Sequence, residues 1–152
     1  ASEVEYLSAG LAPSRQAHRA RRYPMMRYPW DRTEAALRAM ADHSHGVMPE
    51  LDYVNPETGA DVLPTMGFTA MMLAAGLKTT PPRRSCSSAF HVVAGRGRTT
   101  IDGQTVGWGP KDTFSAPVFA SLSHEADEEA FLVRIHDRPL QEKLGYYEER
   151  DS

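Results

Sequence analysis

Several features that mark secreted, membrane or nucleic-acid-binding proteins are scarce or missing in this sequence. Cys86 is the only cysteine, so no disulfide can form within the chain, and we expect a reducing compartment, the cytoplasm. The start, ASEVEYLSAG, lacks the basic and then apolar pattern of a secretory signal. The most apolar run, AMMLAAGL, is much shorter than the ~20 residues of a membrane-spanning helix.

An excess of basic charge is also absent. The 17 Lys and Arg residues are outnumbered by 20 Asp and Glu residues, which gives a formal net charge of −3. A chain without an overall positive field has no general attraction for nucleic acids or anionic membranes, so neither is an expected partner. The length of 152 residues favours one domain with a substantial core.

Helical periodicity is confined to two short stretches. WDRTEAALRAMADH predicts one helix, with Asp31 as N-cap and Leu37 among the apolar residues at helical spacing. Before it, the basic run QAHRARRYPMMRYPW has neither a helical nor a strand period, so we predict an extended arm that docks on a neighbouring barrel or stays mobile. At the other end, Asp137 before a proline and Gly145 after the last apolar residue predict a short helical tail.

Short strand-like runs fill the rest of the chain. They are TMGFTAMML, AFHVV, RTTI, QTVGW, DTFSAP, SLSHE and AFLVRIH. NPETG, the Asp102-Gly103 pair and GPKD are turn signals between them. This spacing predicts an all-β sandwich or barrel over residues 46–137, between an arm and short helix at 1–45 and a helical tail at 138–152.

An ordered set of these segments resembles one known family. FHVVAGRGRTTIDG, GWGPKDTFSAP and FLVRIHDRPLQEKLG resemble the cupin barrel of the gentisate 1,2-dioxygenase family, and RYPWDRTEAAL and LDYVNPETGADVLPTMG resemble its interdomain linker and C-terminal half. The resemblance implies a cupin-type double-stranded β-helix, or jelly roll. In that family two such barrels share one longer polypeptide, and one of them holds Fe(II) on three histidines while gentisate is opened with O₂.

The histidines of that iron site are missing from this barrel. In the alignment on PPRRSCSSAFHVVAGRGR, the family's first pair of histidines falls on Pro82 and Arg84, with Arg83 between them. Proline offers no side-chain donor atom, and a guanidinium stays protonated without a lone pair for a metal. The third ligand's usual spacing after a proline leads to Leu122; His124 lies two positions further, on the same strand face, displaced by ~6.6 Å.

One inward histidine does not make an iron site. Adding His91, on what we take to be the adjacent strand, gives only two imidazoles, so we predict no metal in this barrel and keep His91 and His124 as weak candidates. Structural, hydrogen-bonded roles are the simpler interpretation of both. The His43 and His45 pair lies in a predicted loop without a third ligand, and we interpret it as a surface feature.

The arginines allow two interpretations. Arg83 and Arg84 either lie in a solvated loop, which we favour, or clamp a carboxylate in the position of the lost iron. In the second case Phe90, Trp108 and Phe119 would supply the apolar lining of a ligand pocket. Cys86 is interpreted as a half-buried thiol rather than a nucleophile, although the arginines would lower its pKa.

Three functional hypotheses follow. The first is a metal-free C-terminal cupin of a gentisate 1,2-dioxygenase-like protein, structural or oligomerising, with Fe(II) only in the parent enzyme. The second is a non-catalytic cupin that binds an aromatic carboxylate. The third is an independent metal enzyme that adds a ligand such as Asp112 or His136 to His91 and His124. We also expect a homodimer, or pairing with an upstream cupin half, because strand edges and an unpacked arm gain from a partner.

Overall fold

A computed structural model describes residues 27–43 and 47–152 of the chain. Most of the predicted arm, including His18–Arg22, and His45 of the histidine pair lie outside these residues. His43 is described: it is the last residue of helix α2, and its Nδ1 lies 2.8 Å from the Ala39 carbonyl oxygen. No helix among the described residues is long and apolar enough to span a membrane.

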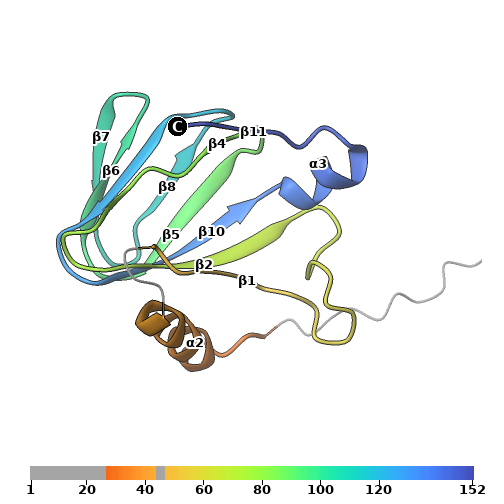
Figure 1. Ribbon diagram of the computed structural model, residues 1–152, viewed down its shortest axis with the longest axis horizontal. Helices are drawn as coiled ribbons and strands as arrows, with labels where there is room; N and C mark the ends of the chain where they lie inside the picture. The colour runs from red at the N-terminus through yellow and green to blue at the C-terminus, as the bar shows by residue number, and fades with distance from the viewer. Residues whose placement is uncertain (1–26, 44–46) are drawn as a thin grey trace, which may run out of the picture.

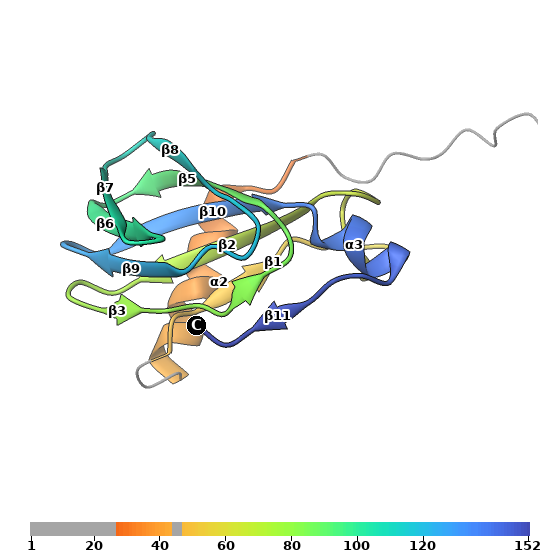
Figure 2. The ribbon, with the colours of Figure 1, turned by 90° about the horizontal axis from the view of Figure 1, so that it is seen from above.

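Two antiparallel sheets enclose the core and confirm the predicted all-β jelly roll (Figure 1). The five-stranded sheet has the order β1-β2-β10-β5-β8, formed by Glu50–Asp52, Gly67–Leu73, Ala130–His136, Ser88–Ala94 and Thr113–Ala116. The four-stranded sheet has the order β3-β9-β6-β7, formed by Lys78–Thr79, Leu122–Ala126, Gly97–Ile101 and Gln104–Trp108. Strands β4 and β11, Arg83–Arg84 and Glu149–Arg150, form a separate pair beside them (Figure 2).

Strand alternation divides the apolar residues into two clusters. Because successive side chains point to opposite faces, Leu132 faces the barrel interior while Phe131 packs on the outer side. The interior cluster contains Met71, Leu73, Phe90, Val92, Trp108, Ala116, Ala120, Leu122, Ala126, Ala130 and Leu132. The outer cluster packs helix α2, Trp30–His43, against the five-stranded sheet, with Leu37 fully buried.

The two predicted helices form, with one difference at an end. Helix α2 begins at Trp30, so Asp31 lies in its first turn and the N-cap assignment was wrong. The Trp30 ring meets the Phe131 ring edge-on at a centroid distance of 5.7 Å, which favours including Trp30 in the helix. Helix α3, Arg138–Leu144, follows Asp137 and ends at Gly145, whose φ of 77° is left-handed, as predicted.

The turn chemistry of the sequence sets the strand register. Asp102 and Gly103 have φ values of 47° and 85°, so this pair forms the tight β6–β7 hairpin that was predicted. In GPKD, the Gly109 N–H donates to Asp112 Oδ2 over 2.8 Å and Lys111 has a φ of 73°. Asp112 therefore stabilises a turn, and its carboxylate has this structural partner. Strand β11 was not predicted; residues 138–152 had been assigned to a helical tail alone.

Candidate functional site

Arg83 and Arg84 lie on a short strand, not in the solvated loop that we favoured. Strand β4 pairs with β11, and the register places Arg84 opposite Glu149 and Arg83 opposite Arg150. The two arginines point to opposite faces: Arg83 is exposed, whereas the Arg84 side chain is only 12% exposed. The loop interpretation failed because it ignored the C-terminal strand, which converts this segment into paired β structure.

Arg134 is a second buried arginine, and it was missing from the predicted site. It is 3% exposed, and its cross-strand neighbours are Thr69 on β2 and Phe90 on β5. Its Nε and Nη1 have no hydrogen-bond partner among residues 27–43 and 47–152. The signal was present in AFLVRIH, where Arg134 has the same strand parity as Leu132 and therefore had to face the barrel interior.

His124 faces the interior, as the strand parity predicted, and is fully buried. Its Nδ1 lies 2.8 Å from Thr99 Oγ1, and that hydroxyl oxygen accepts a hydrogen bond from Trp108 Nε1 over 2.9 Å. The Phe90 ring lies 5.2 Å from the His124 ring, centroid to centroid. His124, Thr99 and Trp108 thus form a buried hydrogen-bonded chain, and Trp108 takes part in it as a core residue.

The Thr99 hydroxyl lies between two nitrogen atoms. The indole N–H of Trp108 can only donate, so it occupies one lone pair of Thr99 Oγ1. The hydroxyl hydrogen or the second lone pair of Thr99 then meets His124 Nδ1, so both tautomers of His124, with the proton on Nδ1 or on Nε2, fit this chain. That Nε2 atom is buried and has no partner within the described part of the chain.

The electrostatics of this interior are positive. Burial, then the charges of Arg84 and Arg134, lower the pKa of His124 to about 4, so the imidazole is neutral at pH 7. Burial and then the Arg84 charge likewise lower the pKa of Arg134. Because a guanidinium keeps its proton at neutral pH, the buried Arg134 and the largely buried Arg84 place two positive charges near a neutral histidine.

His136 is buried at the same end of the barrel but has a different hydrogen-bonding pattern. The Thr69 hydroxyl donates to Asp52 Oδ1 over 2.5 Å and lies 3.1 Å from His136 Nε2. Because the hydroxyl hydrogen of Thr69 points to Asp52, the Thr69 oxygen accepts a hydrogen bond from His136 Nε2–H. The other ring nitrogen of His136, Nδ1, is then unprotonated and can only accept a hydrogen bond. Burial and then the Arg134 charge lower the pKa of His136 to about 4.

The predicted metal candidates are not brought together. His91 and His124 lie in different sheets, so the assumption of adjacent strands was wrong. His91 has the strand parity opposite to Phe90, and its Nδ1 lies 3.0 Å from Thr113 Oγ1 at an exposed position. Among residues 27–43 and 47–152, no group of three or more His, Cys, Asp or Glu side chains is placed to hold a metal ion.

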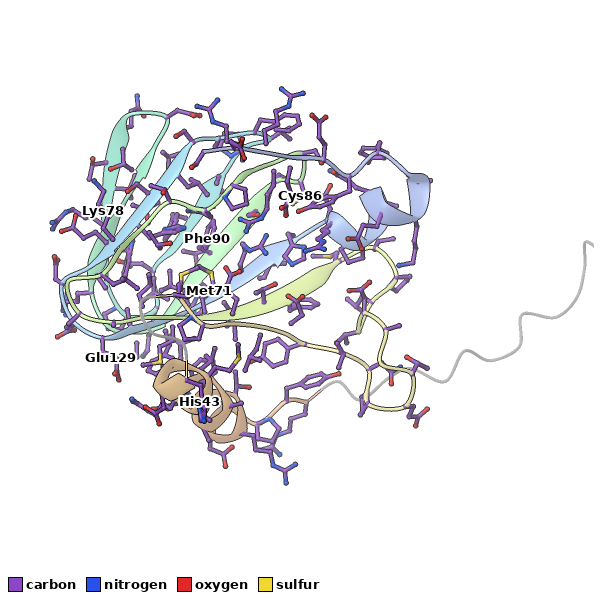
Figure 3. The ribbon with its side chains drawn as sticks, in the orientation of Figure 1. His43, Met71, Lys78, Cys86, Phe90 and Glu129 are labelled. Atoms are coloured by element: carbon purple, nitrogen blue, oxygen red, sulfur yellow. The ribbon has the colours of Figure 1, made fainter. Side chains whose placement is uncertain are left out.

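Only two of the three aromatic residues proposed as a pocket lining lie together. Phe90 and Trp108 belong to the packed interior, and Phe90 stacks on Phe114 at a centroid distance of 5.0 Å. Phe119 instead makes a cation–π contact with Arg150, whose Cζ lies 4.1 Å from the centroid of the Phe119 ring. Cys86 is fully rather than half buried, and burial raises the pKa of its thiol despite the nearby arginines. In Figure 3, Phe90 and Met71 lie in the middle of the barrel, and Cys86 lies toward α3.

Comparison with known proteins shows which family the chain matches. A gentisate 1,2-dioxygenase of Ralstonia sp. is 37% identical over 97% of this chain and 43% of that protein. A 5-aminosalicylate 1,2-dioxygenase of Comamonas sp. is 35% identical over 84% of this chain and 36% of that protein. The chain belongs to the gentisate 1,2-dioxygenase family. It spans less than half the length of the curated relatives that it matches.

The fold of the family agrees. The salicylate 1,2-dioxygenase of Pseudaminobacter salicylatoxidans superimposes with a TM-score of 0.76 at 29% identity, over 82% of this chain and 38% of that one. No protein-family profile matches the chain. The iron that the gentisate 1,2-dioxygenase resemblance implies requires three imidazoles, whereas this interior offers His124 and His136 on different sheets beside two guanidinium groups. These residues do not fit such an iron centre.

Proposed function

We propose that this chain is the C-terminal cupin of a gentisate 1,2-dioxygenase-like protein, and that it supports a catalytic barrel instead of cleaving the aromatic ring itself. One observation carries the proposal: the interior of this barrel holds the buried Arg134 and the largely buried Arg84, whose side chain is 12% exposed. In this role, the barrel contributes packing surface and subunit contacts, and Fe(II) belongs to another part of the parent protein.

The charge of the interior supports a metal-free barrel. A divalent cation is stabilised by neutral imidazoles and carboxylates, whereas two guanidinium groups at close range repel it. Their charges lower the pKa of His124, which shows that they already act on the most buried imidazole of this interior. Asp52, a nearby carboxylate, accepts the Thr69 hydrogen bond and is exposed to solvent.

Metal analysis and oxygen uptake test this proposal on the purified full chain. We expect far less than one equivalent of iron and no oxygen consumption with gentisate. The relative from Ralstonia sp., purified in parallel, is the positive control for oxygen consumption. Near-stoichiometric iron together with gentisate turnover by this chain would refute the proposal.

The proposal includes an assembly. A homodimer, or pairing with an upstream cupin half, covers the strand edges of the barrel, and a cytoplasmic location remains our prediction. Light scattering at micromolar concentration tests the homodimer. A dimeric mass is expected, and a monomeric mass contradicts the homodimer.

A second candidate function is the binding of an aromatic carboxylate, which the pair of buried arginines favours. Three solved structures of the salicylate 1,2-dioxygenase from Pseudoaminobacter salicylatoxidans, two of them of point mutants, contain gentisate. Calorimetry with gentisate and salicylate tests this function on the present chain, and the absence of both heat and a melting shift excludes it.

A further inference from the structure

Two guanidinium groups, those of Arg84 and Arg134, lie near His124 in the barrel interior. Arg84 and Arg134 each lie close enough to lower the pKa of His124, and Arg84 is the largest electrostatic influence on Arg134. Glu50 and Asp52 act on Arg134 in the opposite direction but rank below Arg84. Arg134 is 3% exposed, so its guanidinium is buried within range of a second positive charge.

The partner of Arg84 is a weak one. Arg84 Nε lies 3.6 Å from Glu149 Oε1, which is an ion-pair distance but too long for a hydrogen bond. The Glu149 side chain is substantially exposed, and the same oxygen accepts the hydroxyl of Tyr147. An exposed, shared carboxylate compensates a buried guanidinium only in part.

Several hydrogen-bond donors of this cluster are free. Within residues 27–43 and 47–152, Arg84 Nε, Arg134 Nε, Arg134 Nη1 and His124 Nε2 have no hydrogen-bond partner. His124 Nε2 is a donor in the tautomer that carries its proton on this atom. Phe90 connects the group, because it is the cross-strand neighbour of Arg134 and its ring contacts the ring of His124.

We propose that Arg84, Arg134 and His124 form a buried anion-binding site at the polar end of this barrel, and that its ligand is a carboxylate group or a similarly small monovalent anion. Buried charges and buried donors require partners of opposite polarity, and an anion satisfies both at once. The inference rests on the proposed function in one respect: the barrel interior is not an iron site.

The geometry limits the class of ligand. Guanidinium groups bind planar carboxylates through two parallel N–H donors, and the unpartnered His124 Nε2 adds a neutral donor in the tautomer that carries its proton there. Divalent anions suit the site less well, because the remaining surroundings of Met71, Phe90 and Leu132 are apolar and fully buried. Formate, nitrate and bromide are therefore the probes, and benzoate tests whether the bound carboxylate can carry an aromatic ring.

Thermal unfolding of the full chain provides the first measurement. Each probe is added as its sodium salt at constant ionic strength, held with a bulky sulfonate buffer anion. A specific ligand in 100-fold excess over its Kd should raise the melting temperature by about 5–10 °C for a chain of this size. Calorimetry on the same sample should give a stoichiometry of one.

Paired variants on one strand test the assignment. Arg84→Met should abolish the melting shift, whereas Arg83→Met, the exposed neighbour on β4, should retain it. Arg134→Met should abolish the shift as well, and Arg134→Lys, which keeps the charge but loses the planar fork, should weaken formate binding at least about 10-fold. If Arg134→Met does not fold, Arg134→Lys and the β4 pair still decide the question.

Anomalous diffraction from crystals soaked in bromide locates the anion directly. Density between the guanidinium groups and His124 supports the proposal, and so does binding of formate or nitrate that Arg84→Met removes. Binding of benzoate in addition identifies an aromatic acid as the ligand. The absence of binding by all four probes overturns the inference, as does a melting shift of equal size in Arg83→Met and Arg84→Met.

Iron analysis separates this inference from the proposed function. An iron-free chain that binds no anion refutes the anion site and leaves the metal-free cupin in place. A chain with near-stoichiometric iron and gentisate turnover refutes the proposed function, whatever its response to formate.

Discussion

The replacement of Thr99 by valine is the sharpest test of the buried hydrogen-bonded chain. The side chain keeps its shape and branched Cβ, but the hydroxyl that serves both Trp108 Nε1 and His124 Nδ1 is lost. Each buried polar atom left without a partner costs about 1–3 kcal/mol. With part of this loss offset by the burial of a methyl group, we expect Thr99→Val to lower the free energy of unfolding by about 3 kcal/mol.

Urea denaturation followed by circular dichroism measures this change. A loss of about 3 kcal/mol corresponds to a fall of roughly 6–12 °C in melting temperature for a chain of this length. The control is Thr100→Val on the same strand, because Thr100 makes only an exposed hydrogen bond to Thr105 and its loss should change stability by less than about 0.5 kcal/mol. If both variants have the stability of the natural chain, Thr99 does not hold the interior in the way described.

The remaining predictions concern pH, backbone approach and thiol reactivity. In the folded chain, His124 and His136 have pKa values of about 4, below the 6.5 of an unfolded histidine. Between these two pH values the unfolded state binds more protons than the folded state, so the free energy of unfolding falls as the pH drops from about 6.5 to about 4. Each of the two histidines accounts for up to about 3 kcal/mol of this pH-dependent change in the free energy of unfolding. His124→Asn should reduce the pH dependence measured by urea titrations, whereas the control His91→Asn should preserve it. Gly97→Ala should destabilise the chain by about 1–3 kcal/mol, because an added Cβ would lie 2.4 Å from the Glu125 carbonyl oxygen and 2.6 Å from the Trp108 ring. The control Gly107→Ala, where an added Cβ has space around it, should change the free energy of unfolding very little in the same assay. Cys86 should react with a disulfide reagent only after unfolding, since burial raises the pKa of its thiol; fast reaction of the native chain would contradict its buried position.

The fold was accessible from the sequence because its signals are local. Alternating apolar residues, the Asp102-Gly103 hairpin and Gly145 after α3 each depend on a few neighbouring residues, and each was predicted correctly. The helix start at Trp30 was missed because packing against Phe131, far away in the chain, extends the helix beyond its expected N-cap. Strand β11 was missed for a related reason: two residues form a strand only where β4 offers a partner.

The candidate site was only partly accessible. The inward direction of His124 followed from parity along one strand, and the unsuitability of Pro82 and Arg84 as metal ligands followed from their chemistry. The pairing of strands into sheets did not follow, and for that reason His91 was placed beside His124. Arg134 was overlooked although its strand parity with Leu132 indicated an inward side chain.

The sequence by itself thus determined most of the strands, the tight turns and the absence of the family's histidine pair, since these depend on residue chemistry and spacing. Only the tertiary structure decided which side chains meet inside the barrel. Strands β4, β9 and β10 belong to three different sheets, and burial of the apolar strand faces packs these sheets together so that the charges of Arg84 and Arg134 lie near His124.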